Sequence, residues 1–226
     1  MMKTIPASVS FLIIFLFTGW LAASYSTKTA DQGETRRLRE TQTRFPLNST
    51  GRAELISRTL RAAYPGIPEY RVNKYSLVIG DLSGRFNLSW SMIAATIWVE
   101  SRFDPARKSL KDAKGLMQLL ENTAAGQALK TGIKYSEDKT VWDDVTNLSL
   151  GARYLLEGYE KEGNFRQTAY YYLAGPRWRK TIVRNSRMRD CLWDYASAVL
   201  REKTKLDILY LGISVNDDNR LSFRAD

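Results

Sequence analysis

An almost uninterrupted apolar run, Trp90 to Val99, ends on a carboxylate, Glu100, and no other feature constrains the fold as much. Ser89 precedes the run and is typical of a residue that caps the N-terminus of an α-helix. At about 100° per residue, Ile93 and Glu100 are separated by roughly two full turns of helix. The sequence therefore predicts a helix with a buried face that carries Glu100 in its last turn.

The position of Glu100 has a consequence for its charge. Burial disfavours the ionised form of a carboxyl group, and the negative end of the helix dipole disfavours it further. We therefore expect the pKa of Glu100 to lie above its ordinary value, as a general acid near neutral pH requires. The alternative is a surface glutamate at a frayed helix end, and the motifs that follow Glu100 argue against it.

The composition excludes several kinds of catalytic site. The 226 residues contain no histidine, which rules out Ser-His-Asp catalysis, Cys-His catalysis and histidine-containing metal sites. The single cysteine, Cys191, allows neither an internal disulfide nor a thiolate metal cluster. Its helical spacing with Met188 and Tyr195 favours a small buried side chain. We expect no metal and no cofactor.

The formal net charge of +10 raises the question of an anionic partner. Nucleic acid is not expected, because the basic residues are scattered and accompany no reading helix, zinc knuckle or paired aromatic RNA-binding motif. Most runs of like charge are solvated faces. One cluster within residues 177–189 stands out, because no acidic residue interrupts it: Arg177, Arg179, Lys180, Arg184, Arg187 and Arg189.

The first 50 residues differ from the rest of the chain. Lys3 is followed by an apolar run from Phe11 to Ala23 and then by small residues, which is typical of a secretory signal peptide. The stretch is also long enough for a tilted membrane helix, so residues 1–25 are expected to be a signal peptide or a membrane anchor. Residues 26–50 are polar and turn-rich, which indicates a linker.

The remaining pattern is helical, so that the chain is expected to be mainly α. A domain is predicted over residues 51–212, followed by a short C-terminal tail over 213–226, with the last helix ended by Gly212. Helices are predicted near residues 53–63, 70–82, 90–100, 116–129, 147–159, 165–173 and 188–210.

An ordered set of short motifs accompanies Glu100 at compatible spacings. The set resembles the soluble lytic transglycosylase family over roughly residues 88–180. The resemblance implies a lysozyme-like α domain that cleaves peptidoglycan between N-acetylmuramic acid and N-acetylglucosamine. The motifs are Glu100-Ser101-x-Phe103-x-Pro105, Ser109, Ala113-x-Gly115-Leu116-Met117-Gln118-Leu119, Thr123-Ala124, Asn147-Leu148 with Gly151 and Tyr154-Leu155, and Tyr172-x-Ala174-Gly175-Pro176.

In this family one glutamate performs both proton transfers, and it corresponds to Glu100. The resemblance implies that Glu100 first protonates the glycosidic oxygen. As a carboxylate it then takes the proton from the muramyl 6-hydroxyl, which closes a 1,6-anhydro ring. A second carboxylate is not required, unlike in the scheme of most glycosidases.

The resemblance also implies roles for other residues. Ser109 and Gln118 match positions that contact the substrate in relatives, and Tyr172 matches the tyrosine that orients the catalytic glutamate. Gly115 is expected to allow close approach of the backbone to the sugar.

Two apolar residues, Met117 and Leu120, are expected to line the cleft, although such side chains more often belong to the core. Three positions depart from the family pattern. Leu173 replaces an asparagine, Asp112 replaces a glycine, and Glu121-Asn122 replaces a turn that contains proline.

Two other functions stay open. Glu121, if it faces the cleft, could activate water and make the chain a hydrolytic, lysozyme-type muramidase. A non-catalytic, membrane-tethered scaffold could bind glycan without needing Glu100. For either enzyme, peptidoglycan strands are the expected partner, and the periplasm or cell envelope is the expected location. Residues 177–189 are expected to contact peptide-stem carboxylates or anionic wall polymers. Residues 1–25 are a possible inner-membrane anchor.

Overall fold

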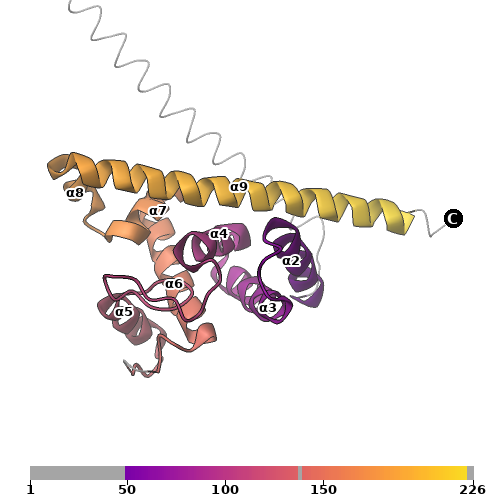
Figure 1. The fold of residues 1–226 in the computed structure, drawn as a ribbon, viewed down its shortest axis with the longest axis horizontal. Coiled ribbons are helices and arrows are strands. Elements are labelled where there is room, and N and C mark those ends of the chain that lie inside the picture. The colour runs from indigo at the N-terminus through magenta and orange to yellow at the C-terminus, as the bar shows by residue number, and fades with distance from the viewer. Residues whose placement is uncertain (1–48, 137–138, 223–226) are drawn as a thin grey trace, which may run out of the picture. The chain divides into compact units, whose positions relative to one another are not determined.

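In the computed structural model of the chain, residues 49–136 and 139–222 are described. Across these ranges the chain is mainly α, as predicted, with isolated β-bridges as its only β structure. The helices are shown in Figure 1: α2 (Ser49–Ala63), α3 (Glu69–Phe86), α4 (Trp90–Ser101), α5 (Glu121–Thr131), α6 (Asp144–Glu162), α7 (Phe165–Ala174), α8 (Trp178–Arg184) and α9 (Ser186–Ser222).

The structure does not describe most of the residues to which the N-terminal predictions refer. The signal peptide or anchor predicted for residues 1–25 lies outside the described ranges, as does nearly all of the linker predicted for 26–50. None of the described helices combines the length and the hydrophobicity that crossing a bilayer requires.

The predicted helix that carries Glu100 is confirmed as α4. The Ser89 hydroxyl accepts the backbone N–H of Met92 at 3.4 Å and so caps the helix. Ile93 and Ile97 are fully buried, so the predicted core face is confirmed too. Because α4 packs against both α3 and α9, it belongs to the centre of the core.

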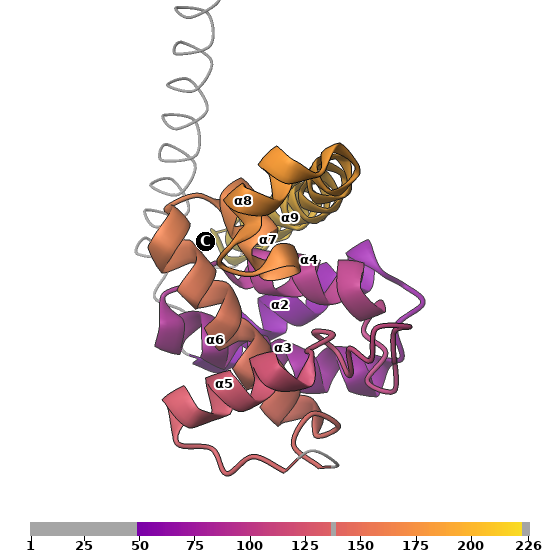
Figure 2. The same cartoon turned by 90° about the vertical axis from the view of Figure 1, so that its left-hand side faces the viewer.

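Helix α9 covers much of the domain and packs against α2, α4, α7 and α8. Figure 2 looks along α9 and shows α4 beneath it, with α5 on the opposite side of the domain. The predicted end at Gly212 is wrong, because the helix continues to Ser222. A glycine inside a helix costs about 1 kcal/mol relative to alanine, which is too little to stop a long helix by itself.

A second correction on α9 concerns Cys191, which is exposed instead of buried. The core face of this part of α9 is formed by Leu192, Ala196 and Val199, which are 0–1% exposed. Since adjacent residues differ by about 100° around a helix, Cys191 points away from that face.

The segment of residues 102–120 joins α4 to α5 and is called the site loop below. A helix predicted from about Leu116 begins only at Glu121. Leu116 and Met117 are fully buried, but they lie in the loop, and Gln118 has a positive φ of 46° that a helix does not allow. The apolar pattern was therefore correct about burial and wrong about the backbone.

Helix α6 approaches the site loop at Gly151. A Cβ atom added there would lie 2.4 Å from Sδ and 2.6 Å from Cβ of Met117. Contacts this short do not occur between non-bonded atoms, so the close packing of α6 against Met117 depends on glycine.

We expect the Gly151→Ala variant to lower the free energy of unfolding by about 1–3 kcal/mol, because the added methyl group would overlap the Cβ of the fully buried Met117 and not only its flexible end. Gly126→Ala is the matched control, since an added Cβ in α5 meets no atom within 4 Å. It should raise stability by up to about 1 kcal/mol through helix propensity. Urea denaturation of both variants measures the difference, and effects of the same sign would contradict the packing argument.

Candidate active site

Glu100 lies in the last turn of α4, where the sequence predicted it. The residue keeps part of its surface open to solvent, while its carboxyl group is largely surrounded by protein. Burial raises the pKa of Glu100 from its ordinary value of 4.5 to about 7, and no described carboxylate contributes to the shift. The predicted upward shift is therefore confirmed, with burial as its cause.

One hydrogen bond opposes this effect of burial. The Tyr195 hydroxyl of α9 donates to Oε1 of Glu100 at 2.6 Å, which favours the carboxylate and lowers the pKa of Glu100. Burial and the Tyr195 bond together leave the group close to half-protonated at neutral pH. The same hydrogen bond fixes the position of Oε1 and so defines the orientation of the Glu100 carboxyl group.

The sequence predicted that Tyr172 would orient Glu100, but its hydroxyl group has another hydrogen-bond partner, and the orienting role stays a prediction. The Tyr172 hydroxyl donates to the main-chain oxygen of Met117 at 2.7 Å, so it holds the site loop. Tyr172 is 8% exposed, and burial together with the nearby charge of Glu100 raises the pKa of its hydroxyl well above its usual value. It therefore stays a neutral donor beside the carboxyl group.

Tyr195 was missed as a site residue, although the sequence held a signal for it. It lies three residues after Leu192, at the edge of the apolar face of α9. A tyrosine on the buried side of a helix needs a partner for its hydroxyl group. The sequence could not identify Glu100 as that partner, because 95 positions separate the two residues.

Asn147 of α6 connects several parts of the site loop. Its side-chain oxygen accepts the N–H of Met117 at 2.8 Å, and its amide nitrogen donates to the main-chain oxygens of Lys114 at 3.0 Å and Val141 at 2.9 Å. The side chain is 1% exposed and fully used, and a satisfied buried amide of this kind makes its surroundings rigid. The sequence placed Asn147 in the motif set without a role.

The site loop is also attached next to Glu100 itself. The buried hydroxyl of Ser101 donates to the main-chain oxygen of Leu116 at 2.7 Å. Together with the Tyr172 bond, this ties residues 116 and 117 to two helices. The loop is therefore held by side chains that α4 and α7 supply.

Gly115 and Met117 both have structural reasons for their identity. Gly115 has a positive φ of 78°, and an added Cβ would lie 2.4 Å from the Asn147 amide nitrogen, so Asn147 already requires glycine here, and the approach of a sugar stays a prediction. The Met117 side chain is fully buried against Gly151 and belongs to the core instead of the cleft.

Ser109 lies in a tight turn of the site loop. Its hydroxyl oxygen accepts the N–H groups of Lys111 at 3.2 Å and Ala113 at 3.1 Å. Asp112, which departs from the family glycine, adopts a positive φ of 63° that aspartate tolerates, and pairs with Lys108 at 2.6 Å. The departure therefore preserves the turn, and the substrate contact of Ser109 stays a prediction.

Gln118 and Leu120 lie at the surface of the site loop. The Gln118 side chain donates to the main-chain oxygens of Arg107 at 2.9 Å and Gly115 at 2.8 Å, and Leu120 is 47% exposed. Their substrate contacts also stay predictions. Glu121 is exposed at the first position of α5, where a carboxylate is favoured by the helix dipole.

We expect Tyr195→Phe to raise the pKa of Glu100 above about 7, because the variant removes the donor that stabilises the carboxylate. Tyr172→Phe is the matched control, because its hydroxyl binds Met117, and it should lower stability with little change in that pKa. NMR titration of labelled glutamate measures both. An equal shift in the two variants would show that the assignment of Tyr195 is wrong.

The raised pKa also predicts a pH-dependent stability. Between about pH 4.5 and pH 7 the folded state holds the proton of Glu100 and the unfolded state does not, so stability falls as the pH rises. Relative to Glu100→Gln, the wild type should lose at most about 3 kcal/mol across this window and nothing further above it. Denaturation at pH 4, 6 and 8, values that bracket the window, measures the loss, and a constant difference would contradict the shift.

The sequence matches the family described as Transglycosylase SLT domain over residues 78–190, half of the chain. Membrane-bound lytic murein transglycosylase C of Sodalis glossinidius is 29% identical over 116 residues, which cover 50% of this chain and 32% of that protein. The protein of the same name from Photorhabdus laumondii is 31% identical over 93 residues, 40% of this chain and 26% of the relative. The chain thus spans no more than about a third of these curated relatives.

Two solved structures share the fold. The 70 kDa soluble lytic transglycosylase of Escherichia coli has a TM-score of 0.51 at 22% identity, covering 70% of this chain and 30% of that one. Lytic transglycosylase Slt of Pseudomonas aeruginosa, solved as an inactive glutamate-to-glutamine mutant, has a TM-score of 0.52 at 24% identity, covering 74% and 30%. The predicted family fold is thereby confirmed, and the chain belongs to the transglycosylase SLT domain family.

Proposed function

We propose that this chain is a peptidoglycan lytic transglycosylase that cleaves between N-acetylmuramic acid and N-acetylglucosamine and leaves 1,6-anhydro-muramyl ends. The observation that carries the proposal is a single carboxyl group, Glu100, with its pKa at about 7 and a donor fixed on one oxygen. The family match and the names of the curated relatives support the same activity.

The proposed reaction uses Glu100 twice. The protonated group gives its proton to the glycosidic oxygen while the bond from that oxygen to the muramyl C1 breaks. The carboxylate of Glu100 then takes the proton of the muramyl 6-hydroxyl while the oxygen of that hydroxyl bonds to C1. This transfer restores the protonated form of Glu100. A pKa at about 7 suits both steps, because neither protonation state is strongly disfavoured at neutral pH.

Tyr195 acts on the state between these two steps. Its hydroxyl group donates to the carboxylate that proton loss creates, at a position where burial alone would make that charge costly. It also keeps one oxygen occupied, so that the other oxygen of Glu100 is left to exchange the proton. Tyr195 is therefore proposed as a positioning residue.

Two features favour this reaction over hydrolysis and over a binding scaffold. No described carboxylate contributes to the pKa of Glu100, which supports a reaction that uses this one group as both acid and base. A scaffold that only binds glycan would gain nothing from a carboxyl group poised at neutral pH. Glu121 is the residue that a hydrolytic mechanism would need.

We place the activity in the cell envelope, on peptidoglycan strands. The curated relatives are named as membrane-bound, and the apolar run of residues 11–23 supports secretion or attachment to the inner membrane. Three residues of the site loop are the proposed contacts of the glycan: Ser109 and Gln118, which are half-buried, and Leu120, which is exposed.

Mass spectrometry of muropeptides released from purified sacculi by the full-length chain tests the function. We expect products one water lighter than reducing-end muropeptides, absent with Glu100→Gln and retained with Glu121→Gln. Reducing-end products that disappear with Glu121→Gln would establish hydrolysis instead. The absence of any product from the wild type would favour the scaffold.

The pH profile of the reaction should follow the pKa of Glu100. Because the free enzyme must carry the proton, kcat/KM should fall above about pH 7. In the Tyr195→Phe variant the alkaline limb should move to higher pH, since the carboxylate has lost its donor. An alkaline limb that stays in place in this variant would contradict the proposed role of Tyr195.

A further inference from the structure

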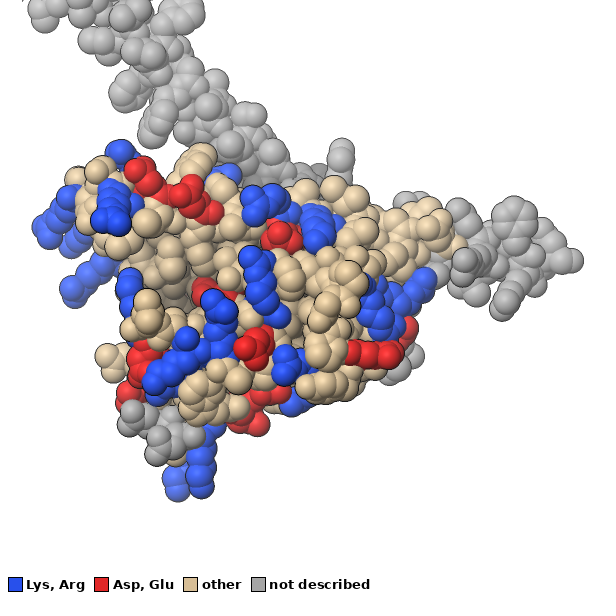
Figure 3. Space-filling view, viewed as in Figure 1, with Lys and Arg blue, Asp and Glu red and all other residues tan. Residues whose placement is uncertain are grey.

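Helix α8 presents a basic face that the reaction at Glu100 does not use. Arg177, Lys180, Thr181 and Arg184 follow one another at intervals of three, one and three residues, so that they lie on one side of the helix. They line an open pocket of about 330 Å³, called the basic pocket below. Figure 3 shows Lys and Arg side chains gathered at the end of the domain that carries α8.

The positive charges of the basic pocket have no carboxylate partner within the described part of the chain. Arg177, Lys180 and Arg184 form no ion pair there, although they are close enough together to line one pocket. Like charges on one helix face repel each other and destabilise the helix. An anion bound between them would remove this repulsion.

Arg179 belongs to a different arrangement, although it lies in the same basic cluster. Its guanidinium group forms a bidentate pair with Glu162, whose side chain is 3% exposed, with one N–O distance of 2.9 Å. It also lies over the ring of Trp178, at 4.4 Å from the centroid. Arg179 therefore anchors α8 to α6 and is not available to a ligand.

The side of α8 opposite the basic pocket is fixed to the rest of the domain. Trp178 is 4% exposed, its indole N–H donates to Glu162 at 3.0 Å, and its ring packs against Tyr170 at 5.1 Å. Because Trp178 and Arg179 fix one side of α8, the backbone positions of Arg177, Lys180 and Arg184 are fixed on the opposite side. A fixed helix lowers the entropic cost of gathering these cations around an anion.

We propose that the basic pocket binds carboxylate groups of the peptide stems carried by the glycan, an inference that rests on the proposed function. Arginine side chains pair with carboxylates through two parallel hydrogen bonds. The Thr181 hydroxyl already donates to the main-chain oxygen of Arg177 at 3.4 Å, so the cations are the donors of the pocket. A pocket with few cations suits discrete carboxylates better than the flat surface of a membrane.

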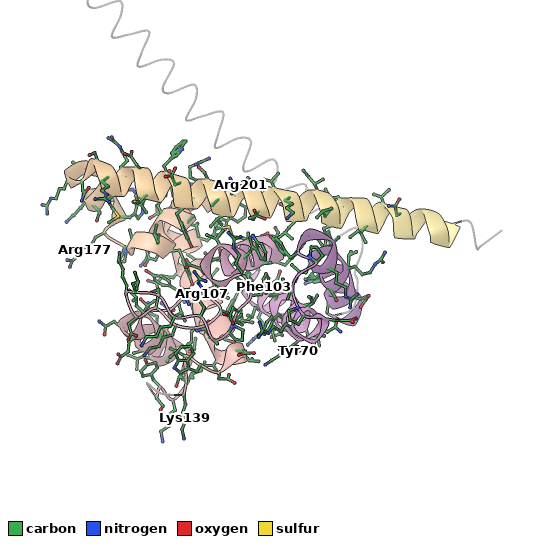
Figure 4. The ribbon with its side chains drawn as sticks, in the orientation of Figure 1. Tyr70, Phe103, Arg107, Lys139, Arg177 and Arg201 are labelled. Carbon is green, nitrogen blue, oxygen red and sulfur yellow. The ribbon has the colours of Figure 1, made fainter. Side chains whose placement is uncertain are left out.

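The position of α8 in the fold supports a ligand that is attached to the glycan. Only residues 175–177 separate α8 from α7, which carries Tyr172 and through it holds the site loop. In Figure 4, Arg177 and Arg107 of the site loop lie on the same side of α9. The basic pocket and the site loop therefore lie on the same side of α9, as a ligand that reaches from one to the other requires.

Binding measured in the full-length Glu100→Gln background, where no turnover occurs, tests the proposal. The probes are soluble glycan strands with their peptide stems and the same strands after an amidase has removed the stems. We expect Arg177→Gln with Arg184→Gln to weaken binding of the stem-bearing strands about 10-fold to 100-fold, and to leave the stripped strands unchanged. The loss should shrink at high salt.

Arg187→Gln with Arg189→Gln is the matched control, because it removes the same charge from neighbouring exposed positions outside the basic pocket. An equal loss in the control pair, or an equal loss on stripped strands, would overturn the proposal and leave only general electrostatic attraction. Binding of anionic phospholipid vesicles that depends on Arg177 and Arg184, with no effect on stem-bearing strands, would overturn it in favour of a membrane. The proposed function fails separately, if the wild type releases no anhydro products.

Discussion

The burial of one carboxyl group at the end of α4 is the constraint on which the site depends. A carboxyl group that is taken out of water must lose its charge or find donors, and Glu100 does both in part. Burial favours the neutral form and the Tyr195 hydroxyl favours the carboxylate, so the group is balanced between the two. Neither α4 nor α9 could produce this balance alone, because one helix supplies the acid and the other its donor.

The site loop depends on the same principle, applied to backbone groups. A loop that is packed into a core must have its N–H and C=O groups satisfied. Asn147, Ser101 and Tyr172 satisfy them from three different helices, and Gly115 and Gly151 provide the space that Asn147 and Met117 occupy. The site loop is therefore supported by residues of the motif set, and this support explains why glycine and asparagine occur at positions 115, 147 and 151.

The charge of the protein also has two different uses. Arg179 is neutralised by a buried carboxylate and fixes α8, while Arg177, Lys180 and Arg184 stay unpaired among the described residues and line a pocket. The sequence shows all of them as one basic run. Only the distances between side chains separate a structural arginine from those that can meet a ligand.

The sequence by itself determined the local features. A capped apolar run ending in Glu100 is a matter of helical periodicity, and the ordered motifs identified the family and hence the fold. Only the tertiary structure decided which tyrosine contacts Glu100, that Met117 is core, that α9 continues past Gly212, and which arginines are free of partners. The physical reason is that periodicity describes which face of a helix is buried, whereas hydrogen bonds and ion pairs join residues far apart in the chain, and their partners are set by packing.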